Sequence, residues 1–324
     1  MSLCATTAFA ACSLQAIQQR AELYAHIRQF FAERNVLEVE TPLLSQAGTT
    51  DVHLSSIAAQ RHILGQKQTH YLHTSPEFAM KRLLASGSGA IYQLCKVFRD
   101  DEHGRKHNSE FTMLEWYRPN FNLQDLMKET HALVEHCLQR PISIHQQSYK
   151  QVFQHKLGIN PLQSTVAQLK AISQHHQLDI DLGDDRLAYL DLLFSHLIEP
   201  DLGKQHAIFL TDFPKELASL AKVHVDDDGD EVASRFELYI NGLELANAYD
   251  ELADAEQLRQ RFIRDNQQRQ TMGIRTMPID EHLLAALPAM PACSGIALGV
   301  DRLLMIKMGK KHLHDVLAFP AERA

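Results

Sequence analysis

Cysteine is scarce in this chain of 324 residues, and no two of its cysteines form a CxxC pair. The scattered spacing argues against a structural zinc site and favours a reducing compartment over a disulfide framework. Long apolar runs are also missing, since none approaches the ~20 residues of a membrane span. Phe9–Cys12 loosely resembles a lipoprotein cleavage site, but no Lys or Arg precedes it. We therefore expect a cytoplasmic protein without a membrane anchor.

A basic excess is absent as well. The formal net charge is −8, whereas nucleic-acid-binding surfaces are normally rich in Lys and Arg. The composition thus argues against a nucleic-acid-binding surface. Hydrophobic residues make up 45% of the chain, which is ample for a large core, in one or two domains.

Both common phosphate-binding loops are missing, because neither GxGxxG nor GxxxxGK[ST] occurs. The expected helices span 14–35, 75–85, 186–197, 257–270 and 301–308, and the expected strands span 36–40, 91–98, 111–118, 208–211, 235–240, 243–248 and 295–300. Asn241-Gly242 is a strong two-residue hairpin turn. Strands joined in hairpins, with helices around them, predict an α+β fold whose antiparallel sheet is flanked by helices.

The strand at 111–118 has two unlike faces. Alternate side chains share a face, so Phe111, Met113, Glu115 and Tyr117 lie together, opposite a core-like set. This composition suits the floor of a pocket, and the alternative is a half-buried surface strand.

Two later segments also combine polar groups with small residues. Gly242–Glu251 carries three acids and an Asn, and its alternative reading is a solvated acidic hairpin. Gly295–Arg302 has two glycines that let the backbone approach a ligand closely, followed by an Arg bracketed by apolar residues.

In their order, these segments resemble motifs 1, 2 and 3 of class II aminoacyl-tRNA synthetases. The matching features are the helix, strand and Thr-Pro at 34–43, Phe98-Arg99 with its loop and strand, and the Gly-rich strand before Asp301-Arg302. The strings that resemble the lysyl branch are Ser75-Pro76-Glu77, His107-Asn108-x-Glu110-Phe111-Thr112-Met113, Glu244-Leu245-Ala246-Asn247 and Glu251-Leu252. Glu115-Trp116-Tyr117-Arg118-Pro119 resembles in particular the elongation factor P–(R)-β-lysine ligase family of truncated paralogues.

The resemblance runs from about residue 15 to Pro320 and implies a class II catalytic fold. Motif 1 begins within the first 40 residues, so we expect a flexible N-terminus at 1–13 and a catalytic domain at 14–324 without an anticodon-binding domain. The implied activity is ATP- and Mg²⁺-dependent activation of (R)-β-lysine as an aminoacyl-adenylate and its transfer to a lysine of elongation factor P. It also implies a homodimer through motif 1 with Pro42 buried at the contact, and makes tRNA an unexpected partner.

By the same resemblance, Arg99, Arg302 and Glu244 are the catalytic residues: Arg99 at the α-phosphate and carboxylate, Arg302 at the γ-phosphate, and Glu244 as the Mg²⁺ ligand. Guanidinium groups suit a reaction that joins two anions. The implied ATP-binding residues are Arg99, Asp100, Asp101, Asn108, Phe111, Glu244, Leu245, Gly299 and Arg302. The implied substrate-binding residues are Ser75, Pro76, Glu77, Tyr117, Asn247, Glu251 and Ala297. We expect Glu251 at the distal ammonium and Glu77 at the nearer one, and this acid-rich set favours a diamino acid.

Two positions depart from the family pattern. Asp101 replaces the usual Glu of Phe-Arg-x-Glu, so its adenine-side contact is weakened or moved to Glu102. Ala297 stands where lysyl-tRNA synthetases carry Gly, and we hypothesise that its methyl favours β-lysine over α-lysine. The alternatives are a lysyl-tRNA synthetase lacking the anticodon domain and a non-catalytic regulatory paralogue. Asparagine synthesis would need an aspartate pocket, which these acids would repel. No base for the transfer step is identified.

Overall fold

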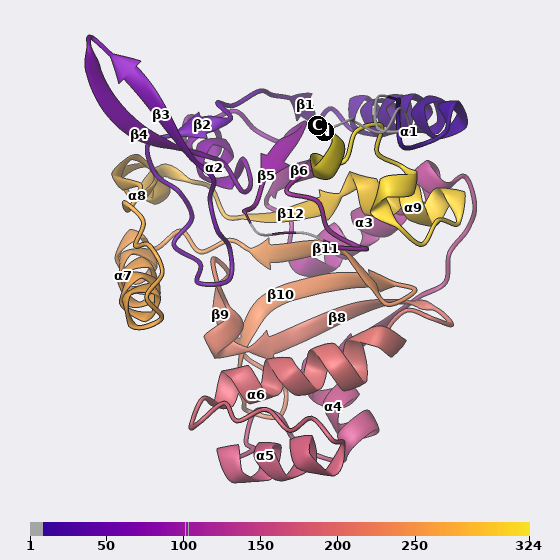
Figure 1. Cartoon of the computed structure of the whole chain (residues 1–324), viewed down its shortest axis with the longest axis vertical. Coiled ribbons are helices and arrows are strands. Elements are labelled where there is room, and N and C mark those ends of the chain that lie inside the picture. The colour runs from indigo at the N-terminus through magenta and orange to yellow at the C-terminus, as the bar shows by residue number, and fades with distance from the viewer. Residues whose placement is uncertain (1–8, 101, 103) are drawn as a thin grey trace, which may run out of the picture.

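The computed structural model describes residues 9–100, 102 and 104–324. Within them, the central feature is a nine-stranded sheet in the order β1-β5-β6-β12-β11-β10-β8-β7, with β9 beside β10 (Figure 1). The strands are β1 (Leu37–Glu38), β5 (Ile91–Phe98), β6 (Glu110–Pro119), β7 (Ile144–Ser148), β8 (Ala207–Pro214), β9 (Val223–Val225), β10 (Glu231–Ile240), β11 (Leu243–Asp250) and β12 (Cys293–Gly299). All pairs are antiparallel except β1–β5 and β7–β8 at the two edges. The predicted α+β class is confirmed, with a sheet that is mixed at its edges.

The helices group around this sheet. They are α1 (Leu14–Ala32), α2 (Glu77–Ala85), α3 (Leu123–Leu138), α4 (Tyr149–Leu157), α5 (Val166–His175), α6 (Arg186–Leu193), α7 (Ala255–Thr271), α8 (Glu281–Ala286) and α9 (Val300–Met308). Ser13 caps α1 as predicted, because its Oγ accepts from the amide of Ala16 at 3.2 Å. In the part of the chain that the structure describes, no helix is long and apolar enough to cross a bilayer.

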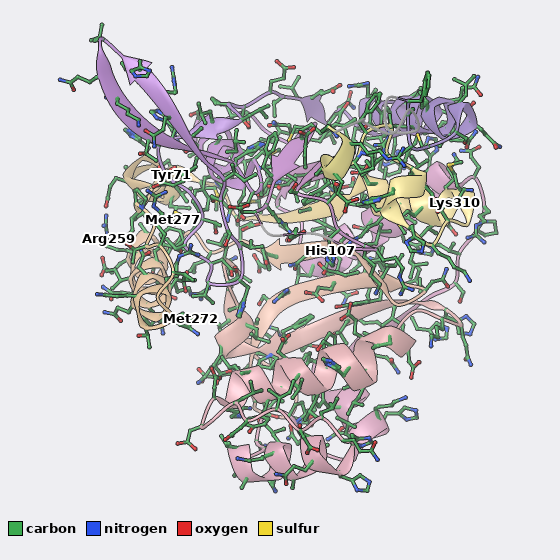
Figure 2. All side chains as sticks on the ribbon, viewed as in Figure 1. Tyr71, His107, Arg259, Met272, Met277 and Lys310 are labelled. Atoms are coloured by element: carbon green, nitrogen blue, oxygen red, sulfur yellow. The ribbon has the colours of Figure 1, made fainter. Side chains whose placement is uncertain are left out.

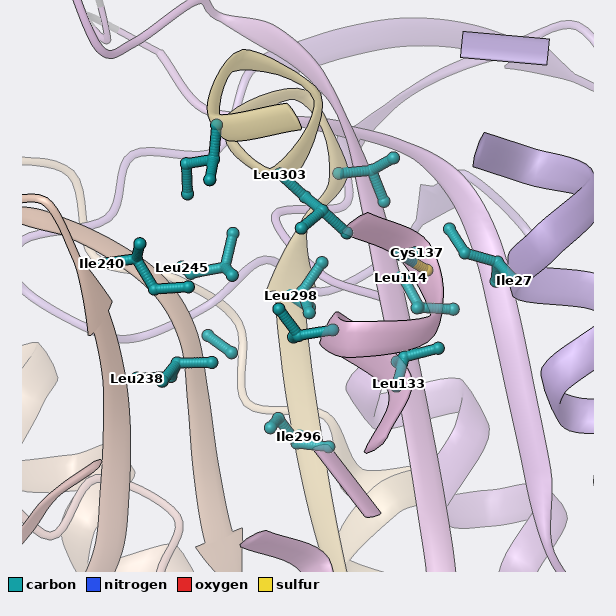
Figure 3. Close-up of a cluster of buried hydrophobic side chains, with 14 of the residues drawn as sticks. Ile27, Leu114, Leu133, Cys137, Leu238, Ile240, Leu245, Ile296, Leu298 and Leu303 are labelled. Carbon is teal, nitrogen blue, oxygen red and sulfur yellow. The ribbon is translucent and has the colours of Figure 1, made fainter. Parts of the chain in front are cut away.

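The main core fills the space between one face of the sheet and α1, α3 and α9. In Figure 3, Ile296 and Leu298 of β12 lie between Leu238 of β10 and Leu133 of α3, and all four belong to this core. Alternate residues of each strand point to this side, so the other face remains for polar groups. Each fully buried Leu or Ile contributes roughly 1.5–3 kcal/mol, and this cluster therefore fixes the position of the central strands. A second core lies under α4, α5 and α6 and is built around Tyr149, Phe153 and Phe194.

A smaller three-stranded sheet consists of β2 (Leu44–Ser45), β3 (Ala58–Ile63) and β4 (Gln66–Leu72). Its β3–β4 hairpin projects from the body of the molecule (Figure 1), and Leu64 at the tip is fully exposed. This hairpin was not predicted, because β3 and most of β4 carry polar side chains on both faces and show no apolar alternation. The short edge strand β7 was also not predicted.

Most predicted elements are confirmed within a few residues. The predicted strand at 36–40 is shorter, because only Leu37–Glu38 pairs with β5. Asn241 and Gly242 have φ of +54° and +68°, as a type I′ hairpin turn requires, so this prediction is also confirmed. At the N-terminal end, the Ala11 amide donates to the carbonyl of Ala318 at 2.7 Å. Pro42 is exposed in the single chain, and its burial in a dimer stays a prediction.

Candidate active site

A cavity of about 1680 Å³ opens over the face of the sheet opposite the main core. Its lining includes every described residue that was predicted for the ATP and substrate sites except Asp100. Asp101 lies outside the described residues. Segments far apart in the sequence thus contribute to one site, and the two ends of this cavity differ in chemistry.

The two-residue period of the strands places the polar groups on the cavity side. On β6, Met113, Glu115 and Tyr117 line the cavity, while Leu114 and Trp116 lie in the main core. The predicted pocket-floor face of this strand is therefore confirmed. The neighbouring strands contribute Arg235, Glu237, Glu244, Asn247, Gly295 and Ala297 to the same face.

One end of the cavity contains Arg99, Arg302, Glu244 and Phe111, and it is called the nucleotide end here because the sequence predicts ATP binding by these residues. The guanidinium of Arg99 lies 5.1 Å from the centre of the Phe111 ring, and its Nη1 is 3.3 Å from Oε1 of Glu102. Arg302 donates from Nη1 to the backbone oxygen of Glu244 at 2.7 Å, and the same nitrogen is 3.9 Å from a carboxylate oxygen of Glu244. Neither arginine is held in a bidentate ion pair, so phosphate oxygens can compete for both.

His107 belongs to the same end. In Figure 2 it lies near the middle of the molecule, apart from Arg259 and Met272 on the α7 side. Burial lowers its pKa, and the nearby positive charges of Arg302 and Arg99 lower it further. His107 is therefore neutral at neutral pH and lies beside two permanent cations.

Three predicted nucleotide-site residues have specific surroundings. The side chain of Asn108 is buried. Its amide nitrogen donates to the backbone carbonyl of Glu110 at 2.5 Å, and its amide oxygen accepts from the backbone amide of Ala321 at 3.0 Å. A ligand contact from this side chain could use its second N–H, because the amide nitrogen carries two donors. Leu245 is packed in the main core, so its backbone is the part available to a ligand. A Cβ on Gly299 would meet only the Arg302 side chain, at 3.7 Å or more.

Glu237 is a second carboxylate of the cavity, and it was not predicted. It is buried, forms an ion pair with Arg235 and accepts from the hydroxyl of Tyr239 at 2.5 Å. Burial raises its pKa to about 7, with Arg235 opposing and the charge of Glu244 adding to the rise. The sequence could have indicated Glu237, because it lies two residues after Arg235 and therefore on the same, cavity-facing side of β10. Among the described residues, no cluster of three or more His, Cys, Asp or Glu side chains could hold a metal.

The opposite end of the cavity, the amino-acid end, is built around a buried cation. The Nζ of Lys81 lies 2.6 Å from Oε1 of Glu77 and 2.6 Å from Oε2 of Glu251, and its side chain is only 1% exposed. Burial lowers the pKa of Lys81, but the negative charges of Glu251 and Glu77 outweigh it and hold the pKa above its ordinary value. The two predicted acids are thus brought together, and the residue that joins them was not predicted.

Glu115 is the third carboxylate of the amino-acid end, and its role in the site was not predicted either. It accepts from the hydroxyl of Ser75 at 2.6 Å and from that of Tyr117 at 2.7 Å. Burial, and then the charge of Glu77, raise its pKa to about 7. Neutral donors hold this carboxylate, so it remains free to accept a hydrogen bond from an ammonium group.

Strand β12 forms the floor beneath these acids. A Cβ on Gly295 would lie 2.3 Å from Cε1 of Tyr117 and 2.4 Å from Oε1 of Glu251, so only glycine fits there. Ala297 is paired with Glu115 on one side and Asn247 on the other. Its methyl group therefore sits between polar residues of the floor, as the hypothesis about substrate choice requires.

A wall of the cavity is formed by the segment 45–54. Thr50 donates to Oδ2 of Asp265 at 2.7 Å, and buried Arg269 donates to the carbonyl of Asp51 at 2.6 Å. Both partners belong to α7. These bonds tie the wall to a helix that is far away in the sequence.

A family model described as tRNA synthetases class II (D, K and N) matches residues 9–323 of this chain. Three curated relatives are each named elongation factor P–(R)-β-lysine ligase. That of Haemophilus influenzae (strain PittGG) is 47% identical over 309 residues, which cover 94% of this chain and 95% of the relative. That of Edwardsiella ictaluri is 47% identical over 313 residues, covering 94% and 95%. That of Salmonella arizonae is 47% identical over 321 residues, covering 96% and 97%.

Proposed function

This chain belongs to the class II tRNA synthetase family and, within it, to the group of the elongation factor P–(R)-β-lysine ligases, and from this membership we propose its reaction. It activates (R)-β-lysine with ATP as an aminoacyl-adenylate and transfers the acyl group to a lysine side chain of elongation factor P. The observation that carries the proposal is one cavity with arginines at one end and three carboxylates at the other, of which Glu115 and Glu251 are buried.

The first half-reaction joins two anions, and the nucleotide end suits it. A substrate carboxylate oxygen bonds to the α-phosphorus of ATP, the bond to the β-phosphate oxygen breaks, and pyrophosphate leaves. Arg99 and Arg302 would neutralise the charges that otherwise keep these groups apart. Phe111, beneath the guanidinium of Arg99, offers an aromatic face for the adenine ring.

Magnesium fits the donor set of this end in part. Glu244 and Glu237 supply hard carboxylate oxygens, and the phosphate oxygens of ATP would supply others. When bound, the ion would add positive charge to the phosphates. Arg235 is paired with Glu237 and Arg302 lies near Glu244, and both offset the repulsion between these two carboxylates.

The amino-acid end supports a substrate with two ammonium groups. We propose that Glu115 binds the distal ammonium together with Glu251, because Glu251 is already paired with Lys81 and Glu115 faces only neutral donors. Glu77 would contact the ammonium nearer the carboxylate. A substrate with an uncharged side chain would leave part of the negative charge of these carboxylates unbalanced, which is costly in a buried site.

The second half-reaction needs a neutral amine on the acceptor lysine. Its nitrogen bonds to the acyl carbon, the bond to the phosphate oxygen breaks, and AMP leaves. We propose that the amine proton passes to the phosphate oxygen that leaves with AMP. Elongation factor P is proposed as the acceptor in place of tRNA, and the support for it is the name shared by the relatives.

We also propose a homodimer through the motif 1 region. The exposed apolar side chains there, Leu14, Ile17, Leu37 and Leu43, support it. A monomer in light scattering at micromolar concentration would contradict it. A cytoplasmic location is proposed as well, supported by four free cysteines within the described residues.

The decisive experiment has two arms. ATP–pyrophosphate exchange is measured with (R)-β-lysine, α-lysine and norleucine, and we expect exchange with the β-lysine and none with norleucine. The protein is then incubated with ATP, β-lysine and elongation factor P, and the mass of the factor is expected to rise by one β-lysyl group. Charging of tRNA with an unchanged factor would favour a lysyl-tRNA synthetase. No exchange with any amino acid would favour a regulatory paralogue.

A further inference from the structure

Lys81 is a buried ammonium group that the reaction described above does not use. Its nitrogen contacts Glu77 and Glu251, and its side chain is 1% exposed. It lies on the second turn of α2, whose first residue is Glu77, while Glu251 directly follows β11. One ammonium therefore joins two walls of the amino-acid end.

The charges of this end can be counted. Glu77, Glu115 and Glu251 carry three negative charges when ionised, and Lys81 carries one positive charge. Two negative charges remain, and the two ammonium groups of a diamino acid would balance them. Without Lys81, three carboxylates, of which Glu115 and Glu251 are buried, would surround two ammonium groups, and one carboxylate would have to bind a proton.

We propose that Lys81 is a positioning residue that sets the charge of the amino-acid end, so that the pocket matches an amino acid with two ammonium groups. The inference rests on the proposed function. Lys81 acts through Glu77 and Glu251, which it holds in place, and has no contact of its own with the substrate in this scheme.

Other titratable groups packed around the cluster do not alter this count. Burial, with the charge of Glu115, raises the pKa of Tyr117 well above its ordinary value and that of Cys95 to about 12. Burial and the charge of Glu251 raise the pKa of Cys293 to about 12 as well. All three stay neutral near pH 7. The carboxyl groups and Lys81 are thus the members of this cluster whose charges decide how substrate binding depends on pH.

The test compares two substitutions that change the charge in opposite directions. Lys81→Met removes a positive charge, so the carboxyl groups bind protons more tightly. The acid-side midpoint of the pH profile of kcat/KM for β-lysine should rise by at least one pH unit. Glu77→Gln removes a negative charge and should lower that midpoint. Lys81→Arg should keep the wild-type midpoint. The KM for ATP should stay within about threefold in all three variants, because Lys81 lies at the other end of the cavity.

A purely structural role would shift KM in both variants without moving the midpoints apart, and that result would overturn the inference. The melting curve of Lys81→Met shows whether this variant folds. If it does not fold, the Glu77→Gln variant alone decides: a lower midpoint supports the inference, and an unchanged or higher midpoint overturns it. Failure of the proposed function looks different, because wild-type protein would then bind no diamino acid in calorimetry. That outcome overturns both statements before any variant is compared.

Discussion

The two ends of the cavity differ in how closely their charged side chains are paired with other groups of the protein. At the amino-acid end, Lys81, Ser75 and Tyr117 already contact three carboxylates at distances of 2.6–2.7 Å, and two of these, Glu115 and Glu251, are buried. At the nucleotide end, Arg99 and Arg302 keep partly exposed side chains, and their contacts with carboxylates are 3.3 and 3.9 Å long. The charged side chains of the amino-acid end are therefore held by short contacts within the protein. The two arginines of the nucleotide end make longer contacts, which phosphate groups could replace.

This difference has a physical cause. Ammonium groups of an amino acid can be matched by a few fixed carboxylates, which cost least when they are ordered before binding. The triphosphate carries more charge and changes its charge distribution during the reaction, so its partners must be able to move from protein carboxylates to phosphates. Substitutions at the two ends should therefore fail in different ways.

The largest effect is expected for Arg302→Ala at the nucleotide end. Loss of one charged donor at the phosphates should lower kcat of pyrophosphate exchange by about 100- to 1000-fold. The melting temperature should change little, because Arg302 makes only hydrogen bonds to backbone oxygens and one long ion pair. Leu64→Ser at the exposed tip of the β3–β4 hairpin is the matched control and should leave both values unchanged. A loss of activity under tenfold would remove Arg302 from the chemistry.

A smaller effect is expected for Glu115→Gln at the amino-acid end, and its size depends on pH. The folded protein raises the pKa of Glu115 from its ordinary 4.5 to about 7, so the folded state binds more protons than the unfolded state within that window. Stability of the wild type therefore falls as the pH rises from about 4.5 to 7. The variant should lack this decline and be more stable than the wild type by roughly 3 kcal/mol at pH 8.

Denaturant unfolding at pH 5 and pH 8, without substrate, measures this prediction. The same variant should lose affinity for β-lysine, so that activity and stability move in opposite directions. Equal pH dependence in the two proteins would mean that the Glu115 carboxyl is ionised throughout and that the amino-acid end is less dry than its burial implies.

Two glycines on one strand offer the most direct comparison of the two ends. Gly295→Ala puts a methyl group onto the Tyr117 ring and the Glu251 carboxylate, so it should destabilise the protein by about 1–3 kcal/mol and raise the KM for β-lysine. Gly299→Ala meets only the flexible Arg302 side chain. It should keep the melting temperature and raise the KM for ATP alone. Identical behaviour of the two variants would contradict the division of the cavity into two ends.

The smallest effect is expected for Ala297→Gly. Removal of one methyl group from the floor should change the preference for β-lysine over α-lysine by roughly tenfold, within the ~1–3 kcal/mol of a single methylene. Pyrophosphate exchange with both amino acids measures the ratio. An unchanged ratio would show that the substrate backbone lies away from Ala297 and that another residue distinguishes the two isomers.

Strand faces were the part of the site that could be predicted from the sequence. Glu115 and Tyr117 were placed on the cavity face because β-strands repeat every two residues and their neighbours Leu114 and Trp116 are plainly apolar. The hairpin of β10 and β11 followed from Asn241-Gly242 in the same way. Periodicity of this kind needs only local sequence, and it therefore found the sheet that carries the site.

The charge balance of the site could not be predicted in this way. Lys81 sits one turn after Glu77, where a sequence shows only an ordinary surface pair of a helix. Its burial depends on Glu251, which is brought close only by the packing of α2 against the end of β11. For the same reason, the predicted assignment of Glu251 to the distal ammonium was made without Lys81, which is already paired with Glu251.

The place of β12 in the sheet has a consequence for how the chain is made. This strand lies between β6 and β11, yet it belongs to the last tenth of the chain. During synthesis, the native pairing of β12 with β6 and β11 cannot form until Cys293–Gly299 has left the ribosome. Non-local pairing of this kind folds slowly and exposes strand edges to aggregation. We therefore expect the newly synthesised protein to depend on chaperones until α9 has left the ribosome.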